Sequence, residues 1–183
     1  SSYTILIPDM LPIHFKLIIN ILKKYGYHVE LLQTSTRAVV DEGLKNVHND
    51  TCYPALLVIG QFINALKSGK YDVSRTALML TQTGGGCRAS NYIHLLRKAL
   101  KKEFPQVPVI SLNLSGLEKN PGFKFTPALI QHGLYALEFG DIFMRCLYRT
   151  RPYEAVKGSA NAMHEKWKKK VIAFVTQDKI LSH

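Results

Sequence analysis

Hydrophobic and polar residues in the first third of the chain follow the pattern of strands alternating with helices. Residues 3–7 are rich in β-branched and aromatic side chains and stop at a proline, which predicts a strand. Residues 11–25 place apolar side chains three or four positions apart and are followed by Gly26, which predicts a helix. A second strand over 27–33 and a short helix over 37–45 complete a strand–helix–strand–helix unit.

The alternation continues through the middle of the chain. Residues 52–67 show helical spacing of apolar side chains, and Cys52 stands at the start of this predicted helix. The run 76–81 is apolar without alternation, as expected of a strand covered on both faces. A helix over 88–103 and a last strand over 107–112 follow. Four strands alternating with helices predict an α/β fold, a four-stranded parallel, doubly wound (flavodoxin-like) three-layer sandwich.

The pattern changes after residue 126. Residues 128–149 and 154–181 are each typical of one long helix, and Pro152 separates the two. We therefore expect an α/β domain with the candidate site over residues 1–125, and a helical C-terminal appendage over residues 126–183 that packs on the same domain.

Composition narrows the class of protein. The chain has 183 residues, 46% of them hydrophobic, so it can bury a core and is not predominantly disordered. Its longest apolar runs fall far short of the roughly 18 to 20 residues that a bilayer requires, and no secretory leader pattern opens it. We expect a soluble, cytoplasmic protein without a membrane partner. The chain lacks an initiator Met and enters a strand at once, so we expect a segment of a longer polypeptide.

Positive charge dominates the surface. The sequence has 24 Lys and Arg against 13 Asp and Glu, a net charge of +11 with neutral His. Basic patches suit nucleic acids, anionic cofactors such as coenzyme A, or an acidic partner domain, and a solvated basic face is the alternative. Because no nucleic-acid-binding motif accompanies the charge, we expect no nucleic-acid partner.

Three cysteines are the main candidates for chemistry. Cys52 and Cys87 are both predicted where a strand or loop enters a helix, the place where open α/β sheets collect ligands. The partial positive charge of a helix N-terminus stabilises a thiolate, which suits either a nucleophile or a soft-metal ligand. Cys146 lies among apolar neighbours in a predicted helix, so we expect a buried structural thiol there.

Three glycines precede Cys87. Gly84, Gly85 and Gly86 remove side-chain bulk, so that backbone N–H groups can approach a bulky anionic ligand, and an inorganic cluster would fit. No Lys-Ser or Lys-Thr pair follows these glycines, so they do not form a phosphate loop of the usual kind.

Two other interpretations of Cys87 stay open at this stage. The sequence Gly-Gly-Cys-Arg-Ala matches a nucleophile elbow with cysteine in the serine position, which would make the protein a cysteine-dependent hydrolase. Its general base would be His94, His132 or His164. Alternatively, the chain is a structural, protein-binding domain with inert thiols.

Five separated segments carry a resemblance to a known family. They are residues 49–54 (Asn-Asp-Thr-Cys-Tyr-Pro), 81–92 (Thr-Gln-Thr-Gly-Gly-Gly-Cys-Arg-Ala-Ser-Asn-Tyr), 111–118 (Ser-Leu-Asn-Leu-Ser-Gly-Leu-Glu), 147–154 (Leu-Tyr-Arg-Thr-Arg-Pro-Tyr-Glu) and 158–161 (Gly-Ser-Ala-Asn). In this order the chain resembles the carboxyl-terminal part of the large bacterial CoA-substrate-specific enzyme activases. These are related to the activators of 2-hydroxyacyl-CoA (2-hydroxyglutaryl-CoA) dehydratases.

The resemblance implies an iron–sulfur protein of low-potential electron transfer that is not active as an enzyme in this isolated segment. It implies that Cys52 and Cys87 ligate a four-iron (4Fe-4S) cluster, with the three glycines around it. Arg88 and Asn91 would contact cluster sulfur or an anionic ligand. Cys146 stands where we expect relatives to carry an apolar residue.

Two thiolates are fewer than a cluster usually takes. The remaining ligands would come from upstream chain, another subunit, water or substrate, and the isolated segment can therefore lack the cluster. Expected partners are upstream domains of the same polypeptide, including an ATPase activator module, a protein that handles CoA thioesters, and a second copy in a homodimer. Without a phosphate-binding signature, this segment alone should not hydrolyse ATP.

Overall fold

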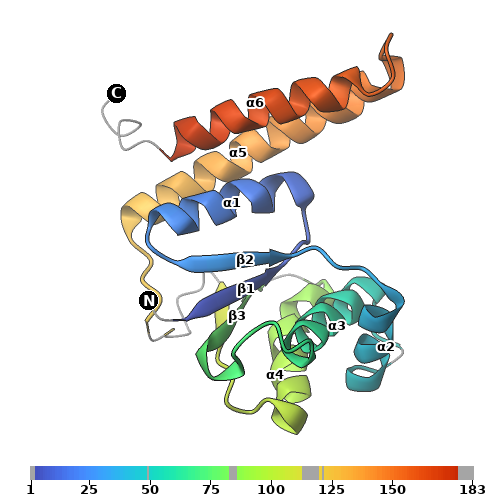
Figure 1. Ribbon diagram of the computed structural model, residues 1–183, viewed down its shortest axis with the longest axis vertical. Helices are drawn as coiled ribbons and strands as arrows, with labels where there is room; N and C mark the ends of the chain where they lie inside the picture. The colour runs from blue at the N-terminus through green and yellow to red at the C-terminus, as the bar shows by residue number, and fades with distance from the viewer. Residues whose placement is uncertain (1–2, 49, 83–85, 113–119, 121, 177–183) are drawn as a thin grey trace. The chain divides into compact units, whose positions relative to one another are not determined.

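Figure 1 shows the computed structural model of the chain, which describes residues 3–48, 50–82, 86–112, 120 and 122–176. Its contacts divide the chain into two compact units. The sheet unit comprises Ser1–Met10 and Tyr27–Lys124, and the helical unit comprises Leu11–Gly26 and Phe125–His183.

The sheet unit is built on four parallel strands. They are β1 (Thr4–Pro8), β2 (His28–Leu32), β3 (Thr76–Thr81) and β4 (Val109–Leu112), in the order β2-β1-β3-β4. In the register, Thr4 of β1 lies opposite His28 on one side and Thr76 on the other. The inner strands β1 and β3 are almost wholly buried, which explains their apolar, non-alternating sequences.

This strand order has a reversal between β1 and β3. The chain passes from β1 to β2 on one side, then returns past β1 to β3 and β4 on the other. Such an order is that of doubly wound, flavodoxin-like sheets, and it opens a crevice at the carboxyl ends of the strands where the order reverses. The α/β class with a parallel, doubly wound sheet, predicted from the sequence, is confirmed.

The helices of the sheet unit are α2 (Arg37–Asn46), α3 (Tyr53–Lys67) and α4 (Tyr92–Glu103), with short 3₁₀ helices η1 (Val73–Arg75) and η2 (Arg88–Asn91). The core of this unit forms where α3 and α4 lie on the sheet. Phe62 of α3 and Leu96 of α4 are fully buried there beside Leu6 and Leu78 of the inner strands. Burial of these side chains fixes where the first turns of α3 and α4 lie.

Helices α2 and α3 approach each other through glycine. A Cβ built on Gly60 would lie 2.0 Å from the carbonyl oxygen of Val39, and one on Gly43 would lie 2.4 Å from the carbonyl oxygen of Leu56. Since both neighbours are backbone atoms, only glycine permits this close approach.

The helical unit contains α1 (Pro12–Lys24), α5 (Pro127–Thr150), the 3₁₀ helix η3 (Arg151–Tyr153) and α6 (Ser159–Val175). Partly buried polar contacts link α1 to α5: His14 Nε2 lies 2.9 Å from Asp141 Oδ1, and the Tyr25 hydroxyl lies 2.8 Å from His132 Nδ1. The unit that holds the C-terminal helices thus also includes α1; the division at residues 125 and 126 stays a prediction. No helix in the described part of the chain has the length and apolar character to cross a membrane.

Three predicted elements differ from the observed ones by more than one residue at an end or in helix type. The helix predicted over 88–103 begins as 3₁₀ turns and becomes α-helical at Tyr92. The strand predicted from residue 107 starts at Val109, after Pro108, which has no N–H to donate to a sheet. The helix predicted over 154–181 starts at Ser159, because Gly158 has a left-handed backbone with φ of 91°. The end of that prediction lies outside the described residues.

Candidate functional site

The candidate site lies at the carboxyl ends of the strands in the sheet unit. Cys52 directly precedes α3, and Cys87 directly precedes η2, the positions that the sequence pattern predicts. Gln82 follows β3, and Asp9 follows β1. Residues far apart in the sequence therefore meet at one edge of the sheet because parallel strands end on the same side.

Cys52 occupies the cap position of α3. Its carbonyl oxygen accepts hydrogen bonds from Ala55 N–H at 3.0 Å and Leu56 N–H at 3.3 Å, and its side chain makes no capping bond. The side chain is half-buried and packs against the core. The thiol is thereby left to contact other groups at the positive end of a fifteen-residue helix.

Tyr92 supplies the closest polar contact of that thiol. The Tyr92 hydroxyl oxygen lies 3.1 Å from Cys52 Sγ, and Tyr92 is only 4% exposed. Burial raises the pKa of Tyr92, and the hydrogen bond to Cys52 together with the negative charge of the Cys52 and Cys87 thiolates raises it further. The phenol is therefore protonated at neutral pH and is able to donate to the sulfur.

A hydrogen-bonded frame holds Cys87. Its carbonyl oxygen accepts from Ser90 N–H at 3.1 Å and from Ser90 Oγ at 2.8 Å. Gln82 Nε2 in turn donates to the Ser90 carbonyl oxygen at 2.7 Å, which ties the end of β3 to η2. Cys87 itself is exposed, so its thiol is accessible to a ligand at this edge.

The frame continues to the end of β4. Asn120 pairs with the Ser111 backbone through its side-chain amide, accepting from Ser111 N–H at 3.2 Å and donating to the Ser111 carbonyl at 3.1 Å. Ser111 Oγ lies 3.4 Å from Gln82 Oε1. Gln82, Ser111 and Asn120 were not predicted as site residues; Gln82 and Asn120 follow strands and Ser111 lies at the end of β4, which is the signal that could have indicated them.

Asp9 is a further group that the sequence analysis missed. One carboxylate oxygen, Oδ2, accepts from Gln33 Nε2 at 3.0 Å. The other oxygen, Oδ1, is buried and has no hydrogen-bond partner among the described residues. The carboxyl end of β1 therefore contributes a polar group to the same edge of the sheet.

The remaining predicted site residues are Gly84, Gly85, Gly86, Arg88 and Asn91. Gly84 and Gly85 lie outside the described residues. Gly86 is exposed, and a Cβ built on it meets no atom of the described residues within 4 Å. Arg88 is the first residue of η2, and Asn91 is exposed at the start of α4, where its side chain makes no capping hydrogen bond. The open space at Gly86 is compatible with a bulky ligand beside Cys87.

The donor set fits an iron–sulfur cluster only in part. Thiolates are the right ligand type, and two cysteines lie at helix starts on this edge of the sheet, but a four-iron cluster ordinarily takes four. Within the described part of the chain, no three His, Cys, Asp or Glu side chains gather into a metal-binding group. Cys52 and Cys87 are ligands of the right type, but they are only two of the four that such a cluster ordinarily takes.

The nucleophile-elbow interpretation depends on a strained backbone and a nearby base. Cys87 has φ of −77° and ψ of 146°, an ordinary extended conformation, and no described non-glycine residue has a positive φ. An elbow places its nucleophile on a strained turn. No histidine in the described residues is hydrogen-bonded to Cys87, and His94 is exposed on α4. His132 and His164 belong to the helical unit.

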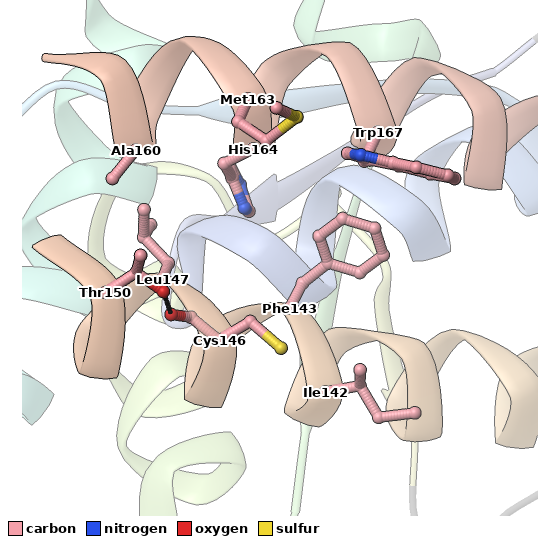
Figure 2. Close-up of a pocket in the computed structure, with 9 residues that line it drawn as sticks. All are labelled: Ile142, Phe143, Cys146, Leu147, Thr150, Ala160, Met163, His164 and Trp167. Carbon is pink, nitrogen blue, oxygen red and sulfur yellow. Dashed lines mark hydrogen bonds between the residues drawn. The ribbon is translucent and has the colours of Figure 1, made fainter. Parts of the chain in front are cut away.

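The expectation of a buried Cys146 is wrong. Cys146 is exposed, and it lines an apolar groove of about 350 Å³ between α5 and α6 (Figure 2). Leu147 of α5 is buried, whereas Cys146 is exposed and Ile142 is 55% exposed, although all three line this groove. Apolar neighbours in sequence surround Cys146 on the helix without covering it.

Comparisons with protein-family models, curated proteins and solved structures gave no match to this chain.

Proposed function

We propose that this chain is the iron–sulfur domain of a CoA-enzyme activase or 2-hydroxyacyl-CoA dehydratase-like protein, in which Cys52 and Cys87 supply thiolates to a four-iron cluster. The observation that carries the proposal is the position of both cysteines at helix starts on the carboxyl edge of the parallel sheet. Cys52 Sγ lies 3.1 Å from the hydroxyl of Tyr92, and Cys87 is exposed. Two soft ligands on this edge favour a cluster at the place where such sheets bind ligands.

The surroundings of Cys52 suit a thiolate ligand. The N-terminus of α3 provides partial positive charge. The Tyr92 hydroxyl lies within hydrogen-bond distance of the sulfur, at 3.1 Å. Hydrogen bonds to ligating sulfur also tune the reduction potential of a cluster. The protein's own part in the function is therefore to hold two thiolates in place and to set their electron density.

The chain supplies half of the ligands. A bound cluster would provide low-potential electron transfer, and its other ligands would come from upstream domains of a longer polypeptide or a second subunit. Such a protein would work with an ATPase activator module and with an enzyme that handles CoA thioesters. It would reside in the cytoplasm, where thiols stay reduced.

Anaerobic reconstitution with iron and sulfide tests the proposal. Iron and acid-labile sulfide are measured in this chain alone and joined to its upstream domains, for the wild type and the variants Cys52→Ser and Cys87→Ser. Cys146→Ser is the matched control, since Cys146 is also exposed but lies in the helical unit.

We expect each of the first two substitutions to abolish most bound iron and sulfide, and Cys146→Ser to leave both at the wild-type level. Iron in the longer protein alone would mean that upstream ligands complete the site. If no form of the wild-type protein took up iron and sulfide, or if all three variants retained them equally, the proposal would be overturned.

A further inference from the structure

The helical unit holds a second cavity besides the groove of Figure 2. It has a volume of about 290 Å³ and is bordered by α1, α5, η3 and α6. Its polar lining consists of Lys16, Arg151, Asn161, His164, Glu165 and Lys168. Three of these side chains are permanent cations at neutral pH, and each comes from a different helix.

The cations outnumber the anions in this cavity. Glu165 is the one carboxylate of its lining, and it is paired with Lys168 Nζ. Within the described residues, no carboxylate forms an ion pair with Lys16 or Arg151. Arg151 is held in place by a hydrogen bond from Nη2 to Asn161 Oδ1 at 2.9 Å and by the Tyr148 ring, whose centroid lies 5.7 Å from its guanidinium carbon. The lining thus has two positive charges in excess.

The pKa of His164 depends on the charged side chains around this cavity. Burial lowers the pKa of His164, and the positive charges of Lys168, Arg151 and Lys16 lower it further against an opposing effect of Glu165. All three cations therefore act on the same imidazole. The helical unit as a whole has the same bias, with twelve Lys and Arg against five Asp and Glu in its sequence.

We propose that this cavity binds the phosphate group of a phosphate monoester or inorganic phosphate. A dianion matches the two excess charges of the lining, and a guanidinium beside two ammonium groups is a typical set of phosphate ligands. Pro12, Ile13 and Leu147 form an apolar part of the lining that suits an organic substituent. Leu147 and His164 also line the apolar groove of Figure 2, so the two hollows are neighbours in one unit. This site is independent of the proposed cluster.

Calorimetric titration of the full chain with phenyl phosphate and with inorganic phosphate tests the proposal. The variants are Lys16→Gln and Arg151→Gln, each checked for wild-type helix content by circular dichroism. Lys169→Gln is the matched control, because it removes the same charge from an exposed position of α6 that does not line the cavity.

We expect saturable binding that weakens at least about tenfold in each of the two variants and less than about twofold in Lys169→Gln, since a hydrogen bond to a charged group is lost only in the former. Tighter binding of phenyl phosphate would identify an organic ester as the ligand, and equal binding would identify free phosphate; both support the site. Nuclear magnetic resonance of the His164 ring adds a local readout, because a bound dianion should raise its pKa.

Two results would overturn the proposal. One is the absence of saturable binding of either phosphate to the folded wild-type chain. The other is equal weakening by Lys169→Gln and Lys16→Gln, which would show a general effect of net charge.

Discussion

The Cys52 sulfur and the Tyr92 hydroxyl lie 3.1 Å apart, although forty positions separate them in the sequence. Cys52 caps α3, and Tyr92 is the first residue of α4. Both helices pack on the sheet, so their N-terminal turns meet beyond its carboxyl edge. The contact therefore joins the N-terminal ends of α3 and α4 at one site.

Replacing Tyr92 with Phe should make the Cys52 thiolate harder to form. The variant loses the hydroxyl that can donate to a Cys52 thiolate and keeps the buried ring, so the pH midpoint of Cys52 alkylation should rise by about one unit. The measurement is the rate of iodoacetamide labelling against pH, read by peptide mass spectrometry. Tyr53→Phe is the control, because Tyr53 is adjacent to Cys52 but 60% exposed. An unchanged midpoint in Tyr92→Phe would show that the contact does not stabilise the thiolate.

The three thiols should differ in reactivity in the native protein. Cys87 and Cys146 are exposed, whereas Cys52 is half-buried and held by Tyr92. Labelling with a chromogenic disulfide reagent should show two fast thiols and one slower thiol, and denaturant should make the three equal. Slow reaction of Cys146 in the native protein would contradict its exposed position beside the groove of Figure 2.

Gly60→Ala should destabilise the sheet unit strongly. The new Cβ would lie 2.0 Å from the Val39 carbonyl oxygen, so α2 and α3 must separate, at a cost of about 3 kcal/mol or more in the free energy of unfolding. Urea denaturation measures this change. Gly133→Ala on α5 is the opposite case: its Cβ meets nothing within 4 Å, so the substitution should stabilise the helix by about 0.5–1 kcal/mol. Equal effects of the two substitutions would refute the close approach.

Glu154 should stabilise the start of α6 in a pH-dependent manner. Its carboxylate accepts hydrogen bonds from Gly158 N–H and Ala160 N–H, which lower the pKa of Glu154 below its usual 4.5. The stabilisation is therefore complete above pH 4.5 and is lost as the pH falls toward the pKa of the folded state.

Glu154→Gln should accordingly lower the stability of the helical unit at pH 7, and its difference from the wild type should shrink in acid. The measurement is urea denaturation, followed by circular dichroism, at pH 7 and in steps below pH 4.5. Glu138→Gln, an exposed substitution on α5, controls for the loss of one negative charge. A difference that stays constant with pH would argue against the cap.

Most elements of the fold could be predicted from the periodicity of apolar residues. The strand at Thr76–Thr81 was predicted at its observed bounds, because a strand buried on both faces leaves an uninterrupted apolar run. The helices α1 and α3 were predicted within two residues, since each combines an apolar stripe with a terminal glycine or an early proline. Local sequence also placed Cys52 and Cys87 at helix starts.

Other features depend on which surfaces meet. An apolar stripe shows that a helix buries one face, but not against which neighbour, so nothing local assigned α1 to the unit of α5 and α6. Cys146 has apolar neighbours in sequence but is exposed in the structure. Consecutive residues of a helix point to different sides, so the side chains next to Cys146 in sequence do not cover it.

The sequence by itself thus determined the α/β class, the order of strands and helices, and the two cysteines at helix starts, because these follow from local periodicity and turn chemistry. The tertiary structure alone decided the contact of Tyr92 with Cys52 and the convergence of Lys16, Arg151 and Lys168 on one cavity. Both depend on the packing of helices that are distant along the chain, and no local pattern encodes the distance between their side chains.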